Sequence, residues 1–344
     1  MRSRRRVIRR HGKVSAIRDN GSHGFPGGVP IVCSRLFFIL ILTLLPFTFP
    51  PRGACGEPSV SRLAALENQW VTAVEAGGGG IWVGTAGGRI AFLRPGARNG
   101  SAYGPADGLP PGKVNSVAVL GGKVYVGTER GFGVFDGSSW TVIGSAEGKT
   151  LVNVFLRAEP DGKALWAGAV NLSGALLRLE GERWKFLGGR GKGLLNNVQA
   201  FAFLEDTAWL GSVSSGVLSM NGDRLRAYGR GEGLPPGTVY ALEPFAGTVW
   251  AGTAGGAARY AEGKWTAYPK SASMPLSSVF CMAAGPDALY LGGPEGLVRH
   301  RGGRFEPFPA GDPSRRIGRV NALLFHGGGL YVGAGDGLLR VEGW

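Results

Sequence analysis

Few residues from position 57 onward have side chains suited to catalysis. Two histidines, His300 and His326, and one cysteine, Cys281, occur there. A metal site or a general base needs partner groups, and no cluster of His, Cys, Asp and Glu with ligand spacing accompanies them. We therefore expect both histidines in loops or at strand edges, and Cys281 as a small buried apolar residue. The sequence predicts no catalytic residue, metal or cofactor, so we expect a protein that is not an enzyme.

Runs of glycine could offer a second kind of chemistry, because glycine-rich loops can bind phosphate through backbone N–H groups. Such runs occupy residues 77–80 and 327–329. A nucleotide-binding loop also needs a Lys-Ser/Thr pair and a following helix, and neither accompanies these runs. We predict that both form hairpin turns.

Polar residues recur two to four positions after a repeated triplet of an aromatic residue, a small or apolar residue and a glycine. They are Glu129, Arg130, Asn171, Ser214, Ser215, Glu295 and Asp336. Such groups can hold a ligand by hydrogen bonds and charge. Their mixed charge, without a cluster of aromatic residues, favours no ligand class. The alternative is that they are solvated loop residues, and the elements that position them decide between the two.

The triplet occurs seven times and ends at glycines 84, 127, 168, 211, 252, 292 and 333, which lie 40 to 43 residues apart. A period in the low forties, with strand-forming residues and glycine turns, is typical of a β-propeller. We predict an all-β fold over residues 57–344, a seven-bladed β-propeller of four-stranded antiparallel blades. Each of these anchor glycines would mark the second strand of one blade.

A valine stands 13 residues before six of the seven anchor glycines, at positions 71, 114, 198, 239, 279 and 320. Each opens a run of β-branched and small residues, which predicts the innermost strand of the blade. In the third blade the interval is 16 or 14 residues, counted from Val152 or Val154, so we expect a longer hairpin around Asp161-Gly162. Large residues open the fourth strands, where diverging blades leave more volume: Trp140, Trp184, Leu225, Trp265 and Phe305.

The last blade reaches Trp344 before a fourth strand begins, whereas residues 58–66 precede the first inner strand. An open sheet edge would remain unless another segment covered it. We predict that residues 59–64 supply the missing outer strand of the seventh blade. In this arrangement, loops after the second and fourth strands share one face. The polar residues named above would then surround the mouth of the central channel, where a ligand would bind.

The net charge of +14 is concentrated near the N-terminus, because residues 1–56 hold ten Lys and Arg and a single acid, Asp19. The remaining residues carry only +5 over seven blades, which does not favour a nucleic-acid partner. The apolar run at 36–45, extended by Phe47 and Phe49, is short for a membrane span and is followed by prolines.

Basic residues, an apolar run and then small residues predict that 1–56 is a leader, either a secretory signal or a membrane anchor. Cleavage after Gly56 would release a periplasmic or secreted protein, and retention would tether it to the membrane through residues 36–50. Lipidation at Cys55 is a further alternative, although Arg52 stands where a lipoprotein motif has an aliphatic residue. The basic stretch is longer than export needs, which also allows a start codon placed too early.

A second motif joins the fourth strand to the next inner strand. Residues 108–114 read Gly-Leu-Pro-Pro-Gly-Lys-Val and recur at 233–239 as Gly-Leu-Pro-Pro-Gly-Thr-Val, with weaker copies at 193–198 and 274–279. Together with the anchor, a Gly-apolar third strand and an acid-glycine turn, this motif resembles the two-component regulator propeller repeat. The resemblance covers all seven units and is most specific in the second and fifth. In the third and fourth, Gly168-Ala169 and Gly211-Ser212 replace Gly-Thr.

Members of that family form the extracytoplasmic sensor portion of bacterial hybrid histidine kinases, so the resemblance implies export and ligand binding without catalytic residues. In such sensors a membrane span and kinase modules follow the propeller, whereas this chain ends at Trp344. We therefore expect any signal to pass to a separately encoded partner, such as a histidine kinase, with membrane contact only through the N-terminal segment.

The sequence is compatible with three functions. The first is an exported, sensor-like module that binds a small ligand or a protein. The second is a scaffold that binds proteins without a small ligand, and the third is an exported propeller lyase or hydrolase. A polar pocket of mixed lining would favour a ligand, whereas an exposed apolar patch of several hundred Å² would favour a protein partner.

Overall fold

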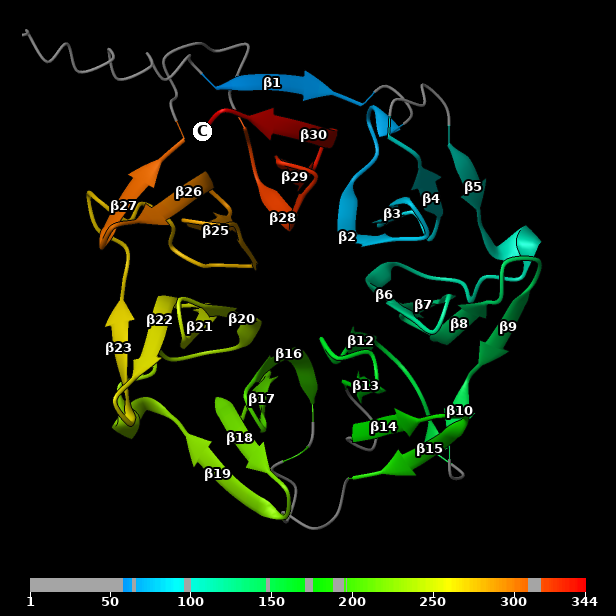
Figure 1. Ribbon diagram of the computed structural model, residues 1–344, viewed down its shortest axis with the longest axis horizontal. Helices are drawn as coiled ribbons and strands as arrows, with labels where there is room; N and C mark the ends of the chain where they lie inside the picture. The colour runs from blue at the N-terminus through cyan, green and yellow to red at the C-terminus, as the bar shows by residue number, and fades with distance from the viewer. Residues whose placement is uncertain are drawn as a thin grey trace, which may run out of the picture. The chain divides into compact units, whose positions relative to one another are not determined.

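In a computed structural model, described residues comprise 58–63, 66–95, 100–146, 149–170, 176–187, 195, 197–308 and 317–344. The predicted leader, residues 1–56, lies outside them and stays a prediction. The described strands form seven four-stranded antiparallel sheets arranged as a ring (Figure 1). The predicted seven-bladed β-propeller is therefore confirmed.

The blades follow one another in sequence order. The first three contain β2 (Val71–Gly77), β3 (Gly80–Thr85), β4 (Ile90–Leu93) and β5 (Ser101–Tyr103), then β6 (Val114–Leu120), β7 (Lys123–Thr128), β8 (Gly131–Phe135) and β9 (Trp140–Ile143), then β12 (Val154–Ala158), β13 (Ala164–Ala169), β14 (Leu176–Glu180) and β15 (Arg183–Phe186). The next two contain β16 (Val198–Leu204), β17 (Thr207–Ser212), β18 (Val217–Asn221) and β19 (Arg224–Tyr228), then β20 (Val239–Phe245), β21 (Thr248–Thr253), β22 (Gly256–Ala261) and β23 (Lys264–Tyr268).

The sixth blade contains β24 (Cys281–Ala284), β25 (Leu289–Gly293), β26 (Gly296–Arg301) and β27 (Arg304–Pro307). The seventh contains β28 (Val320–His326), β29 (Gly329–Ala334) and β30 (Gly337–Glu342), and its fourth strand is β1 (Ser59–Arg62). A small hairpin of β10 (Ser145–Ala146) and β11 (Lys149–Thr150) and two short 3-10 turns, η2 (Pro105–Asp107) and η3 (Arg230–Glu232), lie between blades.

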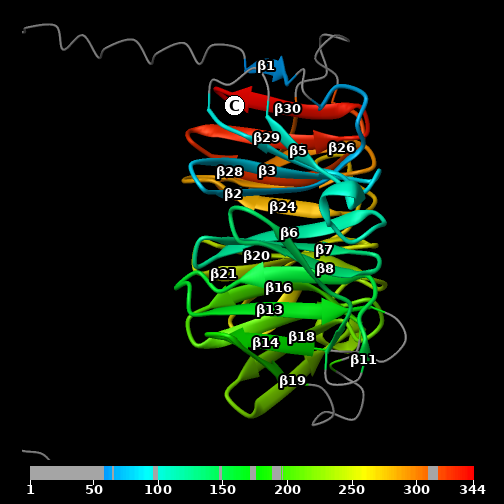
Figure 2. The same cartoon turned by 90° about the vertical axis from the view of Figure 1, so that its right-hand side faces the viewer.

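The closing strand confirms the predicted source of the missing edge. β1 pairs antiparallel with β30, from Ser59 opposite Glu342 to Arg62 opposite Leu339. β1 and the C-terminal strand therefore lie side by side although they are the first and last strands of the chain (Figure 1). The side view in Figure 2 shows the same pair at one edge of the stack of blades. Within the seventh blade, no outer edge of β30 is left for another chain to join.

The hydrophobic core is divided into seven clusters, one between each pair of neighbouring blades. At these interfaces the anchor glycine of one blade contacts the valine that opens the inner strand of the next blade. A Cβ added to the anchor Gly84 would lie 2.3 Å from Cγ1 of Val114, the valine that opens the next inner strand. At Gly333 the corresponding distance, 2.5 Å, is to Cγ1 of Val71 in the first blade. Only glycine leaves room for that valine, which explains the fixed spacing of the two residues.

The third blade differs from the others in the way that its longer interval predicts. In five blades a bulge at the start of the inner strand leaves one residue unpaired, for example between Val71 and Ala73. β12 lacks this bulge, because Val154 faces Ala169 and Phe155 faces Gly168. Its hairpin is longer, closed by the bond from Glu159 N to Ala164 O around Gly162. Val154 is thus the counterpart of the other valines, and Val152 is not.

Candidate functional site

The predicted ligand-binding residues that the structure describes lie in the loops between the second and third strands. Two of them hold the neighbouring loop in place. Glu129 Oε2 accepts a hydrogen bond from the backbone N–H of Lys113, at 3.1 Å. Glu295 accepts a hydrogen bond from the backbone N–H of Ser277 at 3.0 Å and forms an ion pair with Lys270 Nζ at 2.9 Å. Although burial opposes it, these bonds lower the pKa of Glu295. Both contacts join a loop after a second strand to a loop after a fourth strand, so these loops share one face.

The other predicted residues have individual surroundings. Asp336 forms an exposed ion pair, 2.8 Å, with Arg62 of the closing strand β1. Arg130 and Ser214 donate backbone N–H groups to Thr128 and Ser212, whose buried hydroxyls fix the two loops. Asn171 lies outside the described residues. Among those that the structure describes, no hydrogen bond or ion pair joins one of these side chains to another, and their role in binding a ligand stays a prediction.

Aromatic residues that the sequence did not single out gather on the same face. Trp70, Tyr240, Phe280 and Arg319 stand at the starts of four successive inner strands and are named here the mouth group. The Arg319 guanidinium lies 5.6 Å from the ring centre of Trp70 and 4.6 Å from that of Phe280. Tyr240 meets Phe280 edge-on at 5.2 Å. Trp70 is 48% and Tyr240 37% exposed. The expectation that this face lacks an aromatic cluster is therefore wrong, because the ring joins residues far apart in sequence.

The residues with catalytic side chains are mostly structural. Cys281 is buried in β24, as predicted, and burial raises the pKa of its thiol. His326 ends β28 at an exposed hairpin. His300 contradicts the prediction of a loop or edge residue, because it lies within β26 and packs 4.7 Å from Trp250 and 4.8 Å from Phe305. Burial, and then the charge of Arg259, lower its pKa. Glycine-rich context misled the prediction, since the packing partners come from other strands.

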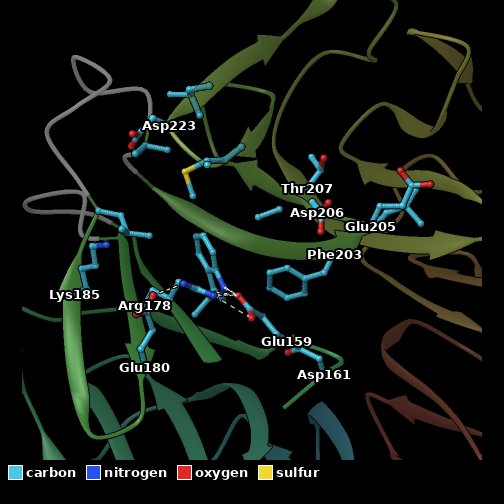
Figure 3. Close-up of a pocket in the computed structure, with 18 of the residues that line it drawn as sticks. Glu159, Asp161, Arg178, Glu180, Lys185, Phe203, Glu205, Asp206, Thr207 and Asp223 are labelled. Carbon is cyan, nitrogen blue, oxygen red and sulfur yellow. Dashed lines mark hydrogen bonds and ion pairs between the residues drawn. The ribbon is translucent and has the colours of Figure 1, made fainter. Parts of the chain in front are cut away.

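A cleft of about 840 Å³ opens between the third and fourth blades (Figure 3). Its walls come from the β12–β13, β16–β17 and β18–β19 hairpins and from β15. These first-to-second and third-to-fourth strand hairpins lie at the face opposite the predicted mouth. The floor is apolar, and its lining includes Trp166, Leu195, Phe203, Met220 and Leu225.

The cleft lies where an aromatic ring of the repeat is replaced by a smaller residue. At four other interfaces the residue that opens the fourth strand is Trp or Phe, and it packs on an aromatic residue of the preceding blade. Trp184 lies 5.2 Å from Phe132, and Trp265 lies 6.0 Å from Trp209. In the fourth blade that position holds Leu225. The smaller side chain lines the cleft together with Trp166, which is itself buried. The sequence signal was this break in the aromatic series.

One wall of the cleft is a fixed polar network. Glu159, whose side chain is 14% exposed, accepts hydrogen bonds from Trp166 Nε1 at 2.7 Å and from Arg178 Nε at 3.0 Å. Arg178 also pairs with Glu180 and lies over the Trp166 ring at 5.6 Å. Figure 3 shows the dashed contacts that converge on Glu159. These groups satisfy one another, so they shape the wall and leave recognition to the remaining side chains.

The rim of the cleft is predominantly acidic. Six acids line it, against two bases, Arg178 and Lys185: Glu159, Asp161, Glu180, Glu205, Asp206 and Asp223. Asp161 pairs with Lys163 at 2.8 Å. Glu205 and Asp206 form no ion pair with the described residues, and Figure 3 shows both at the end of the β16–β17 hairpin. An apolar floor beside these two carboxylates suits a ligand that carries both a cation and an apolar group.

Within the described ranges, no group of three or more His, Cys, Asp and Glu residues could hold a metal ion. No helix there is long and apolar enough to cross a bilayer.

Comparisons with known proteins reveal similarity in structure. No family model matches the chain, and no curated protein matches its sequence. Virginiamycin B lyase from Staphylococcus aureus is similar with a TM-score of 0.64 and 12% identity, over 83% of this chain and 99% of the lyase. PorZ, a surface component of the type-IX secretion system of Porphyromonas gingivalis, gives a TM-score of 0.62 at 14% identity. That match covers 78% of this chain, which spans only 46% of PorZ.

A third similar structure is the extracellular domain of a protein described as a hybrid two-component system from B. thetaiotaomicron. Its TM-score is 0.51 at 15% identity, over 69% of this chain and 38% of that one. The three proteins have different roles, namely a lyase, a secretion-system component and part of a two-component system. At 12 to 15% identity these likenesses show the β-propeller fold.

Proposed function

We propose that the protein is an exported binding module that holds its ligand in the cleft between the third and fourth blades. The observation that carries this proposal is the cleft itself, about 840 Å³ with an apolar floor and a charged rim. A pocket of this volume and mixed lining is typical of a ligand site. The repeat motif at 108–114 and 233–239 supports a sensor-like role within the two-component regulator propeller family.

The ligand chemistry follows from the lining. Glu205 and Asp206 offer carboxylates at the rim, while Phe203 and Leu225 offer apolar surface. The ligand proposed is therefore a cation joined to an apolar group, such as a short peptide with a basic residue beside an aromatic one. An acidic ligand would meet like charges at the rim, which disfavours it.

Export is part of the same proposal. The predicted leader at 1–56 supports it, and so do two of the similar structures, which are an extracellular domain and a surface component. The information about bound ligand would pass to a separate partner, for which a histidine kinase is the candidate. N-terminal sequencing of the exported protein would show whether it begins at Glu57, as cleavage after Gly56 requires.

The cleft can be tested by filling it. Leu225→Trp restores the ring that other blades carry at this position, so we expect a protein at least as stable as the wild type. Phe-Arg-amide and Phe-Glu are suitable probes in calorimetry and thermal shift, because ligand that binds only the folded state raises the unfolding midpoint. We expect the basic probe alone to bind, and Leu225→Trp to abolish its binding. Leu187→Met, a volume-conserving change in the same lining, should retain it. Equal binding by wild type and Leu225→Trp would remove the cleft as the site.

The mouth group favours a second candidate function, a scaffold that binds a protein. Exposed Trp, Tyr and Arg side chains are the types that dominate binding energy at protein interfaces. Trp70→Ala together with Arg319→Ala would then weaken association with a partner from the cell envelope, while Leu225→Trp would leave it intact. The reverse pattern would assign partner binding to the cleft.

A further inference from the structure

Strand register places seven residues at one level around the centre of the ring. Each is the residue of an inner strand that pairs with the aromatic residue of the anchor triplet. In blade order they are Glu75, Ala118, Arg157, Ala202, Glu243, Ala283 and Leu324. Four of the seven are apolar, so the fold needs no charge at this level. The charged ones occur in the first, third and fifth blades, and are named here the central triad.

The central triad meets across the ring. Arg157 Nη2 lies 3.6 Å from Glu243 Oε2. Their strands, β12 and β20, are separated by β16 of the fourth blade (Figure 1), so the pair spans the centre instead of an interface between neighbours. Glu243 Oε1 also accepts a hydrogen bond, 3.3 Å, from the N–H of Ala284 in the sixth blade. Glu75 is close enough for the charges of Arg157 and Glu243 to act on it.

Apart from the bond that Glu243 accepts from Ala284, the triad makes no hydrogen bond to the described residues. The 3.6 Å separation is too long for a hydrogen bond, and Arg157 donates none to the described residues. Glu75 likewise accepts none from them. The Arg157 side chain is 45% exposed although it points to the middle of the ring, so solvent reaches this level. A guanidinium offers five donors in a planar fork, which matches a carboxylate.

The charges of the central triad argue against a role that is limited to stabilising the fold. Two carboxylates and one guanidinium sum to one excess negative charge when all are ionised. Burial penalises the carboxylates and raises the pKa of both Glu75 and Glu243. Partly buried ion pairs stabilise a fold only when geometry is good and the remaining donors are satisfied. Here they are not, and an alanine or leucine fills the same position elsewhere.

We propose that the central triad is a binding site for a small zwitterion of the α-amino acid class, separate from the cleft. Arg157 would take the carboxylate, and Glu75 and Glu243 would take the ammonium group. A cation alone would leave the Arg157 donors unused, and an anion alone would face the excess negative charge. Ala118, Ala202 and Ala283 at the same level carry no charge that would compete for the ligand.

Calorimetry with the full chain tests this site, with glycine and alanine as probes and with methylamine and acetate as probes that carry one charge each. We expect the amino acids to bind and the separate ions to bind at least tenfold more weakly. Arg157→Leu, which mimics Leu324 of the seventh blade, and Glu75→Gln should each weaken amino-acid binding at least tenfold. Arg301→Leu, which removes an exposed ion pair with Asp287, should leave it unchanged.

The outcomes separate the alternatives. Methylamine binding as tightly as glycine, with no effect of Arg157→Leu, would overturn the zwitterion assignment in favour of a simple cation site. No binding of any probe, with both variants more stable than the wild type, would overturn the site altogether. If Arg157→Leu does not fold, Glu75→Gln still decides. Leu225→Trp should leave amino-acid binding intact, which keeps this test independent of the cleft.

Discussion

Among single residues, Glu75 and Glu243 make the folded state sensitive to pH. Burial raises the pKa of Glu75, Arg157 lowers it in part, and the charge of Glu243 adds to the rise. Burial also raises the pKa of Glu243. In the unfolded chain both titrate near their ordinary value. The folded protein therefore holds protons more tightly in the window above that value, and stability falls as pH rises through it.

Glu75→Gln should remove part of this dependence. Between about pH 5 and pH 8, we expect the free energy of unfolding to fall less in the variant than in the wild type. The variant should be the more stable of the two at the upper end, since each tenfold difference in proton affinity is equal to about 1.4 kcal/mol. Urea unfolding at a series of pH values measures this. Glu205→Gln, at an exposed hairpin, should track the wild type. Parallel curves for Glu75→Gln and the wild type would contradict the assignment.

Residue types and loops were predictable from the sequence, but contact partners were not. Glu129 and Glu295 stand in the loops that the repeat predicts, yet each holds a backbone N–H of the preceding connection. A carboxylate two or three residues after an anchor glycine looks the same in sequence whether it binds a ligand or a neighbouring loop. The mouth group was missed for a related reason, because its four members are distant in sequence and only ring closure brings them together.

Of the structural elements, β1 is the strand that the repeat itself does not predict, because it lies before the first blade in sequence. It also closes the ring, since it is the fourth strand of the seventh blade. Leu63 N donates to Leu338 O at 3.0 Å, and the register pairs Ser61 with Arg340. Hydrogen-bonded pairs alternate along an antiparallel ladder, so Ser61 also belongs to a hydrogen-bonded pair. Ser61→Pro should remove that bond and loosen the strand.

We expect faster hydrogen exchange at β30 in Ser61→Pro, and a loss of roughly 1–3 kcal/mol in stability. Ser61→Ala keeps the backbone N–H and should behave as the wild type. Protection of β17, on the far side of the ring, should change only if the whole molecule opens. Unchanged exchange at β30 would show that β1 does not hold the last blade.

The strands themselves were predictable because each repeat states the same pattern in β-branched residues, glycines and turns. Averaging over seven copies corrects weak signals that would mislead in one copy. Departures were harder to interpret. The longer interval in the third blade predicted its hairpin but not the lost bulge in β12. Leu225 broke the aromatic series, but only the structure shows that a cleft lies beside it.

The whole molecule is a ring in which seven interfaces repeat one contact, an anchor glycine against the next valine. An added Cβ would come within 2.1–2.7 Å of that valine at every anchor glycine. The interface between the seventh and first blades, Gly333 against Val71, has the same geometry as those within the chain. In a closed ring the packing at each of the seven interfaces contributes to the stability of the fold. In an open arc the interface between the seventh and first blades would contribute nothing.

This difference predicts the effect of Gly333→Ala. A methyl group there would lie 2.5 Å from Val71 Cγ1, compared with 2.3 Å from Val114 at Gly84 and 2.4 Å from Val320 at Gly292. We expect all three alanine variants to lose about 1–3 kcal/mol from overpacking. Gly335→Ala, two residues away with no atom within 4 Å, should change stability by less than about 0.5 kcal/mol. Urea unfolding of the four variants compares them directly. If Gly333→Ala left the free energy of unfolding unchanged while the other two variants lost stability, the ring would be open in solution. Only an interface that is not packed tolerates that methyl group.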